Sequence, residues 1–104
     1  DDFLNEERFA LAWAGGKFRM LQWGRVRIRY ELKRKGLGDY NIRKGLAAID
    51  EDDYIATLER LAGARWETER RGTGNDLLKR QRLAAFLMRK GYESDLVREV
   101  TERL

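Results

Sequence analysis

Apolar residues recur at helical spacing in the early part of each half of this chain. Each series is preceded by a residue that can cap a helix, Asn5 or Asp50, and by carboxylates that favour the positive end of the helix dipole. The pattern predicts two amphipathic helices. Their apolar positions are Phe9, Ala12 and Trp13 in the first, and Tyr54, Leu58 and Leu61 in the second.

Glycine marks the end of a second predicted helix in each half. Gly36 and Gly91 can adopt the left-handed conformation just beyond a helix C-terminus, with Lys35 or Lys90 beside the last carbonyls. Asp39 or Ser94 is then expected to cap a third helix. The apolar stripes of these third helices are Ile42, Leu46 and Ile49 in one copy, and Val97, Val100 and Leu104 in the other.

The two halves are copies of one unit. The segment Arg25 to Arg43 recurs 55 positions later as Arg80 to Arg98, and Leu4 to Trp13 aligns with Ile49 to Leu58 at an offset of 45. We therefore expect one three-helix repeat over residues 3–48 and another over 49–104. The second repeat has a longer first helix or an insertion near residues 63–77.

Residues 25–30 alternate polar and apolar side chains, which is typical of a half-buried strand. The equivalent segment 80–86 does not alternate and is rich in helix formers, so we interpret both as helical. The chain contains no proline, and most glycines fall at expected junctions, among which we count Gly15 and Gly16. The predicted fold is all-α, an elongated stack of about six helices in tandem three-helix, helix-turn-helix-like repeats.

The second helix of the first repeat, which contains Arg25, is expected to have two apolar faces. One contains Leu21, Ile28 and Leu32, and the other contains Trp23, Val26 and Tyr30. A helix that buries both sides lies inside a stack, so we predict that a further unit packs before this one.

Composition excludes several functional classes. The 104 residues contain no Cys and no His, so the usual zinc, copper and iron ligands and the thiolate nucleophile are missing. Carboxylates such as Glu67 and Glu69 lie among arginines and are expected to be ionised surface groups. We predict a protein that is not an enzyme and that needs no metal and no cofactor.

Sequence features also indicate the cellular setting. The longest apolar runs are far shorter than the roughly 20 residues that cross a bilayer, so no membrane contact is expected. The lack of Cys fits a reducing compartment, and we predict a cytoplasmic protein. Because the first Met is at position 20, we expect the sequence to be part of a longer chain.

Charge is unevenly distributed. The net charge is +4, but basic residues dominate positions 15–45, whereas positions 50–59 carry only acidic charges, beginning with Asp50, Glu51, Asp52 and Asp53. The acidic run lacks the glycine and closing glutamate of a calcium loop, and it is better explained as a helix cap and first turn. Such a field favours a polyanion at one surface and a basic partner at another.

The leading binding candidate is a stripe formed by Arg25, Arg29 and Lys33. The second repeat has Arg80, Ala84 and Met88 there, so the fold does not demand this stripe. It is either a solvated helix face or a contact for phosphates or an acidic protein surface. The pairs that do recur, Arg27 with Arg82 and Arg34 with Arg89, have a structural or a duplicated functional role.

Two further features have competing interpretations. Aromatic residues among the cations, Phe18, Trp23, Tyr30 and Trp66, could stack on bases, although packing is the better explanation. The segment 71–74 (RGTG) resembles part of a phosphate-binding loop but lacks its glycine pattern, so we interpret it as a turn.

Three segments together resemble a known family. They are FLNEERFA (3–10), WGRVRIRYELKRKGL (23–37) and KRQRLAAFLMRKGY (79–92), and they are similar to the second and third of the three tandem three-helix repeats of the bacterial RecX family. The resemblance covers essentially the whole chain. It rests on two copies of R-K-G followed by Leu or Tyr.

The resemblance implies a regulator of the RecA recombinase that lodges in the groove of the RecA filament on single-stranded DNA. There it would inhibit ATPase, strand exchange and coprotease activity, and so modulate repair, recombination and the SOS response. The partners would be the filament and its DNA, and we expect a monomer. The alternative is an independent helix-turn-helix-like nucleic-acid-binding module. In either case the expected contact residues are basic: Arg25, Arg27, Arg29, Lys33, Arg34, Lys35, Arg43, Lys44, Arg80, Arg82, Arg89 and Lys90.

Overall fold

The computed structural model describes residues 2–104, with side chains from residue 5 onward. It confirms an all-α fold, and the described residues contain no strand. The helices are α1 (Asp2–Leu21), α2 (Arg25–Arg34), α3 (Asp39–Ala47), α4 (Glu51–Glu69), α5 (Asp76–Lys90) and α6 (Ser94–Glu102). The alternating segment 25–30 is helical, as its counterpart in the second repeat indicated.

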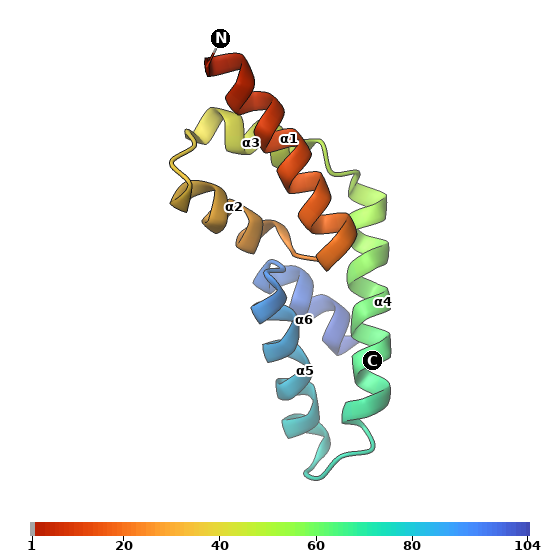
Figure 1. Ribbon diagram of the computed structural model, residues 1–104. Helices are drawn as coiled ribbons and strands as arrows, with labels where there is room; N and C mark the ends of the chain where they lie inside the picture. The colour runs from red at the N-terminus through yellow and green to blue at the C-terminus, as the bar shows by residue number, and fades with distance from the viewer. Residues whose placement is uncertain (1) are drawn as a thin grey trace.

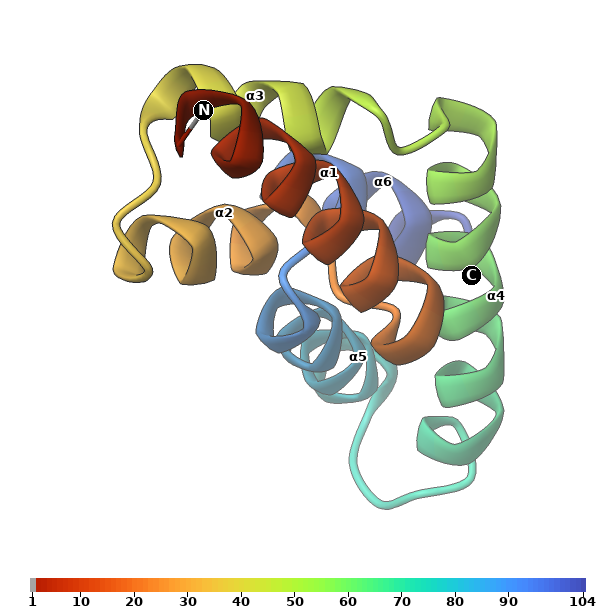
Figure 2. The same cartoon turned by 45° about the horizontal axis from the view of Figure 1, so that its top comes forward.

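The helices form two groups of three along one long axis (Figure 1). α1, α2 and α3 make up one end, and α4, α5 and α6 the other; the turned view shows α1 crossing over α3 (Figure 2). The described chain measures 55 × 24 × 20 Å, and its radius of gyration is 15.5 Å. A compact domain of this size has a radius of about 13 Å. The predicted elongated stack is therefore confirmed.

The apolar stripe predicted for the first helix is displaced by one position. Ala10, Ala14 and Phe18 are buried, whereas the predicted Phe9 and Ala12 are exposed and Trp13 is half-buried against the core. The cause is a close crossing with α3, because a Cβ on Gly45 would lie 2.7 Å from the carbonyl oxygen of Ala10. Only small side chains fit at this crossing, so the large aromatics of α1 lie outside it.

Two more predictions for α1 are wrong. Asn5 lies inside the helix and does not cap it, and Gly15 and Gly16 lie in its second half and form no junction. The helix continues through both glycines because Ala14 and Phe18 on either side are packed in the core. Burial thus outweighs the unfavourable helix propensity of glycine.

The first helix of the second repeat follows its predicted pattern. The Asp50 carboxylate accepts a hydrogen bond from the Asp53 backbone N–H at 3.0 Å, so the acidic run is a cap and first turn. Of the predicted stripe, Tyr54 and Leu58 are buried and Leu61 is half-buried against the core; Ala62 is buried as well.

The second helices end as expected. After α2, the Leu37 N–H bonds to the Leu32 carbonyl and the Gly36 N–H to that of Lys33; after α5, Tyr92 bonds to Leu87 and Gly91 to Met88. These are two Schellman motifs, and both glycines have positive φ, +89° and +102°.

The predicted caps of the third helices are wrong. α3 and α6 each begin one residue earlier, with Gly38 and Glu93 at the N-cap, and neither cap residue accepts a side-chain hydrogen bond. Asp39 is already in the first turn of α3, where its carboxylate lies 3.6 Å from the Lys33 ammonium. The apolar stripes of both helices are buried, apart from the half-buried Leu104.

The two apolar faces predicted for α2 differ in outcome. Ile28 and Leu32 are fully buried, but Leu21 ends α1 and does not belong to this helix. On the opposite face Val26 and Tyr30 are exposed. This second face is uncovered in the described chain, and a unit packing on it remains a prediction.

Candidate functional site

The two repeats meet where the C-terminus of α5 abuts the N-terminus of α2. The Gly24 N–H donates to the Lys90 carbonyl at 2.8 Å, and the Val26 N–H donates to the Gly91 carbonyl at 2.9 Å. Donors and acceptors that helix ends leave unpaired are thus satisfied across the junction. Nearby, the Tyr92 hydroxyl donates to the Gln22 carbonyl at 2.9 Å and the Lys90 ammonium to the Leu21 carbonyl at 2.7 Å.

Arg25 stands at the centre of this junction. Its Nε donates to Glu93 Oε2 at 2.7 Å and its Nη1 to Glu51 Oε1 at 3.0 Å. The guanidinium carbon lies 3.9 Å from the centroid of the Tyr54 ring. We call Arg25, Glu51, Tyr54 and Glu93 the joint cluster.

Tyr54 completes the joint cluster by bonding in both directions. Its hydroxyl accepts from the Arg25 backbone N–H at 2.8 Å and donates to Glu93 Oε1 at 2.6 Å. Burial, together with the hydrogen bond to Glu93, raises the pKa of the Tyr54 phenol far above its ordinary value. Burial opposes the charge of Arg25, but the Glu51 hydrogen bond and the Glu93 charge prevail and raise the pKa of its guanidinium. The cluster therefore holds one cation between two carboxylates.

The structure separates the residues of the predicted stripe. Arg29 and Lys33 are exposed on α2, whereas the Arg25 side chain is only 22% exposed and serves the joint. The residue with which the stripe begins thus fixes how the two repeats are oriented.

Most candidates of the second repeat are also engaged within the chain. Arg80 donates to the carbonyls of Thr101 and Leu104, both at 2.6 Å, and its guanidinium lies 5.0 Å from the Trp66 ring centroid. Arg82 donates to Glu69 Oε1 at 2.9 Å and to the Thr73 carbonyl. The 71–74 segment is accordingly a turn that Arg82 holds in place.

The recurring arginine pairs divide in the same way. Arg27 lies 4.1 Å from the Trp23 ring centroid and reaches the Arg89 carbonyl at 3.5 Å, so Arg27 and Arg82 both make internal contacts. Arg34 makes only contacts within its own helix, an ion pair with Glu31 at 3.4 Å and a contact with the Tyr30 ring at 5.9 Å, and Arg89 is exposed. The first pair supports the structure, and the second pair is open to a partner.

The exposed cations gather on α2 and α3. Arg29 and Arg43 line an open groove between the two helices, of about 420 Å³, whose edge is formed by Arg25 and Glu93. Lys44 lies over Tyr40 at 5.6 Å, and Lys35 over Trp13 at 5.4 Å. We use the name basic face for the exposed cations of α2, its C-terminal cap and α3 taken together: Arg29, Lys33, Arg34, Lys35, Arg43 and Lys44. Of these, Arg29 and Arg43 share the groove, whereas Lys35 contacts Trp13 of α1.

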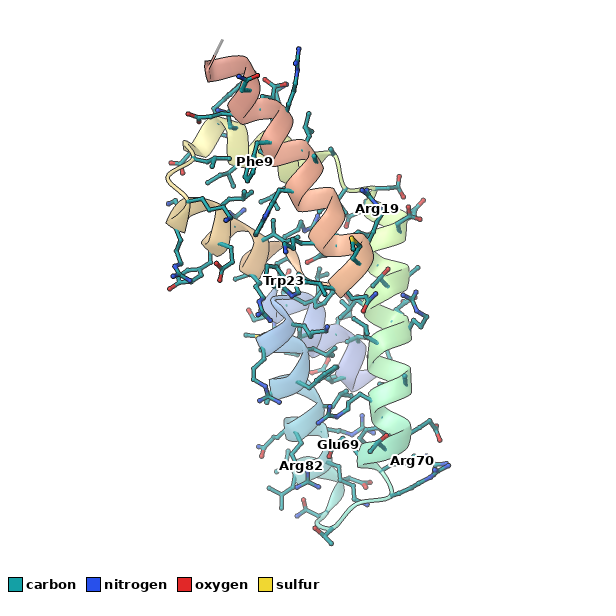
Figure 3. All side chains as sticks on the ribbon, viewed as in Figure 1. Phe9, Arg19, Trp23, Glu69, Arg70 and Arg82 are labelled. Carbon is teal, nitrogen blue, oxygen red and sulfur yellow. The ribbon has the colours of Figure 1, made fainter. Side chains whose placement is uncertain are left out.

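The aromatic candidates are mostly packed. Phe18 is buried, Trp66 lies beneath Arg80, and Trp23 lies beside the joint, where it meets Trp13 edge-on at 5.9 Å (Figure 3). Tyr30 differs, because it is 62% exposed with the Arg34 guanidinium 5.9 Å from its ring centroid. Tyr30 is therefore the aromatic residue among these candidates best placed to meet a ligand.

The candidate carboxylates Glu67 and Glu69 are paired with arginines. Glu69 lies between α4 and α5 beside Arg82, whereas Arg70 points away from the helices (Figure 3). The Arg82 hydrogen bond, aided by Arg65 at 3.2 Å, lowers the pKa of Glu69, which favours its ionised form. Within the described part of the chain, no cluster of acidic side chains could hold a metal ion, and no helix is long and apolar enough to span a membrane.

Sequence analysis missed the partners in the joint cluster. Glu51 appeared only as part of an acidic run, and Glu93 was not singled out by the sequence. Nothing in the one-dimensional pattern links Arg25 to Glu51 or Glu93, which lie far away in the sequence. The available signal was the recurrence of Arg25 as Arg80, since both side chains are engaged within the chain, although with different partners.

Comparison with known families gives two matches. The model described as RecX, second three-helix domain, matches residues 5–46, and the one described as RecX, third three-helix domain, matches residues 51–101. The matched ranges correspond to α1–α3 and α4–α6.

Individual relatives agree. The chain is 30% identical over 103 residues to the regulatory protein RecX of Clostridium perfringens (strain 13 / Type A), covering 99% of this chain and 48% of the relative. It is 32% identical over 99 residues to the regulatory protein RecX of Mycobacterium sp. (strain KMS), covering 93% and 54%. The chain thus spans about half the length of these relatives. No solved structure shows significant similarity to it.

Proposed function

Since this chain belongs to the RecX family, of which it contains the second and third three-helix domains, we propose that it binds the RecA nucleoprotein filament and inhibits RecA activity. It acts as a cytoplasmic regulatory protein, as a monomer, without catalytic activity of its own. The observation that carries the proposal is the basic face, a surface of exposed cations on α2 and α3.

The basic face suits a nucleoprotein partner. A filament on single-stranded DNA presents phosphates, and cations that neutralise phosphates gain free energy from counterion release. Arg29 and Arg43 line one groove from two different helices, so both could reach the same anionic segment. With Tyr30 exposed on α2, the face also offers an aromatic plane for stacking.

The shape of the chain suits a long binding surface. Its 55 Å length consists of two similar units, and each unit can contact a successive site along a repeating partner. The joint cluster fixes the angle between the two repeats in the free protein. Binding to a partner therefore does not have to pay a further loss of entropy for aligning them. Binding by one unit then places the other at a defined position.

The alternative function is independent binding to nucleic acid. A net charge of +4, with Arg25, Arg80 and Arg82 engaged internally, favours weak binding to bare DNA. We therefore prefer the filament as the partner.

The test is the DNA-dependent ATPase of RecA on single-stranded DNA, titrated with this chain. The informative variant is Arg29→Glu with Arg43→Glu, which reverses two groove cations and leaves the joint intact. Reversal of Arg25 is uninformative, because it would place a third carboxylate beside Glu51 and Glu93. The matched control is Arg70→Glu with Arg71→Glu, the same charge change on exposed residues at the far end of α4.

We expect inhibition by the wild type and by the control, and a loss of at least tenfold in potency for the groove variant. Equal inhibition by both variants would reject the basic face as the contact surface. Absence of inhibition by the folded wild-type chain would reject inhibition by these two domains alone.

A further inference from the structure

The second repeat contains a groove equivalent to the one in the basic face. It lies between α5 and α6, and we call it the C-terminal groove. Arg29, Arg43 and Leu46 line the first groove, and the residues 55 positions later line the second: Ala84, Arg98 and Thr101. The two grooves therefore occupy equivalent positions in the two repeats.

The first groove shows what this site accepts. Glu93 enters its edge from the following repeat, and its carboxylate pairs with Arg25 at 2.7 Å. Glu51, also from the second repeat, pairs with the same guanidinium at 3.0 Å. Within this chain, the first groove already receives one carboxylate, that of Glu93, from the neighbouring repeat.

The C-terminal groove has no such occupant. Arg80, the counterpart of Arg25, is turned toward the carbonyls of Thr101 and Leu104. Arg98 has no ion pair with any carboxylate among the described residues. The groove, of about 350 Å³, is thus open with an available cation at its wall.

The rest of its lining is mostly apolar, although Gln81, Ser94 and the Glu102 carboxylate also contribute to it. Leu77 is 63% exposed and Met88 is 48% exposed, at positions that also line the groove. Ala84 replaces the Arg29 of the first groove, so the second has one cation fewer. A phosphate chain gains little from apolar walls, whereas a protein segment buries apolar side chains there.

We propose that the C-terminal groove binds a segment of a recombinase subunit that presents a carboxylate beside apolar side chains. The carboxylate pairs with Arg98, and the apolar side chains pack on Leu77, Ala84 and Met88. This inference rests on the proposed function and adds a protein contact to the nucleic-acid contact of the basic face. The two repeats then have different contacts: the first repeat binds the phosphate backbone of the DNA, and the second repeat binds protein.

The test uses a fluorescent label placed in the groove. Because the chain has no native Cys, Gln81→Cys provides a single attachment site for bimane, on an exposed residue that lines the groove. The control label is at Ala64→Cys, an exposed position on α4 outside the groove. The probe is RecA filament assembled on oligo(dT) with a slowly hydrolysed ATP analogue, and bare oligo(dT) is added separately.

We expect the filament to shift the emission of the groove label to shorter wavelength and to leave the control label unchanged. Arg98→Glu should weaken filament binding about tenfold, while the matched reversal Arg8→Glu on α1 should change it less than twofold. Circular dichroism of each variant confirms that it is folded.

Each other outcome overturns a specific statement. If the wild type binds filament but the groove label does not respond and Arg98→Glu binds normally, the inference fails and the proposed function stands. If bare oligo(dT) shifts the groove label as strongly as filament does, the groove binds nucleic acid and the inference fails. A shift that depends only on the concentration of this chain would assign the groove to a second copy. If no variant and no wild-type chain binds filament, the proposed function itself fails.

Discussion

Replacing Glu93 with alanine should loosen the joint between the repeats. The substitution removes the acceptor of two hydrogen bonds, from the Tyr54 hydroxyl at 2.6 Å and from Arg25 Nε at 2.7 Å. It leaves Arg25 half-buried, with Glu51 as its remaining carboxylate partner. The loss falls at the contact that sets the orientation of the two units.

The expected magnitude follows from burial. A hydrogen bond to a charged group contributes about 1.5–3 kcal/mol. The Glu93 side chain is 29% exposed, so water replaces part of what is lost, and we expect about 2 kcal/mol for Glu93→Ala. Glu51 is 64% exposed, and an ion pair of that kind contributes about 0–1 kcal/mol.

The assay is urea unfolding followed by circular dichroism, supported by thermal unfolding. For a domain of this size, about 2 kcal/mol corresponds to a decrease in Tm of roughly 8–16 °C. A double-mutant cycle between Arg25→Ala and Glu93→Ala should give a coupling of about 1–2 kcal/mol, larger than the cycle with Glu51→Ala. The reasoning is refuted if Glu93→Ala is within about 0.5 kcal/mol of wild type, or if Glu51→Ala costs as much.

Three further predictions concern the glycine turns and the titrating groups. Gly36→Ala should cost about 1–2 kcal/mol for its positive φ alone, since the space around it is open. Gly91→Ala should cost about 1–3 kcal/mol more in the same urea assay, because its Cβ would overlap the Arg27 side chain, and equal costs would contradict the packing. Because the folded-state pKa of Tyr54 is raised, its contribution to stability is complete below about pH 10 and is lost as the pH rises, so Tyr54→Phe should show a smaller alkaline decrease in unfolding free energy. Because the folded-state pKa of Glu69 is lowered, its contribution is present above about pH 4.5 and is lost as the pH falls; wild type and Glu69→Gln should therefore converge in acid, and a constant difference down to low pH would contradict this.

The repeated pattern was sufficient to predict the fold but not the register of α1. Helix-ending glycines and third-helix stripes followed from spacing, because a Schellman turn and an apolar face each depend on nearby residues. The buried face of α1 was displaced by one position because it depends on Gly45, which lies on another helix and permits a close crossing at Ala10. Local spacing carries no information on such a crossing.

The sequence predicted which cations belong to the candidate site but not which of them are free to bind a partner. The sequence located the cations of α2 and α3, and the structure leaves them exposed. It did not separate Arg29, which is open to solvent, from Arg25, which pairs with Glu93 from the other repeat. Partners that lie far apart in sequence decide whether a surface arginine binds a ligand or supports the fold.

The most direct test compares the affinity of this chain for RecA filaments on oligo(dT) with its affinity for bare oligo(dT), by anisotropy of the labelled chain at one salt concentration. The account predicts that filament is bound at least tenfold more tightly, and that Arg29→Glu with Arg43→Glu weakens binding to the filament at least tenfold. Equal affinity for filament and bare DNA, falling steeply with salt, would contradict the account and would favour an independent nucleic-acid-binding module.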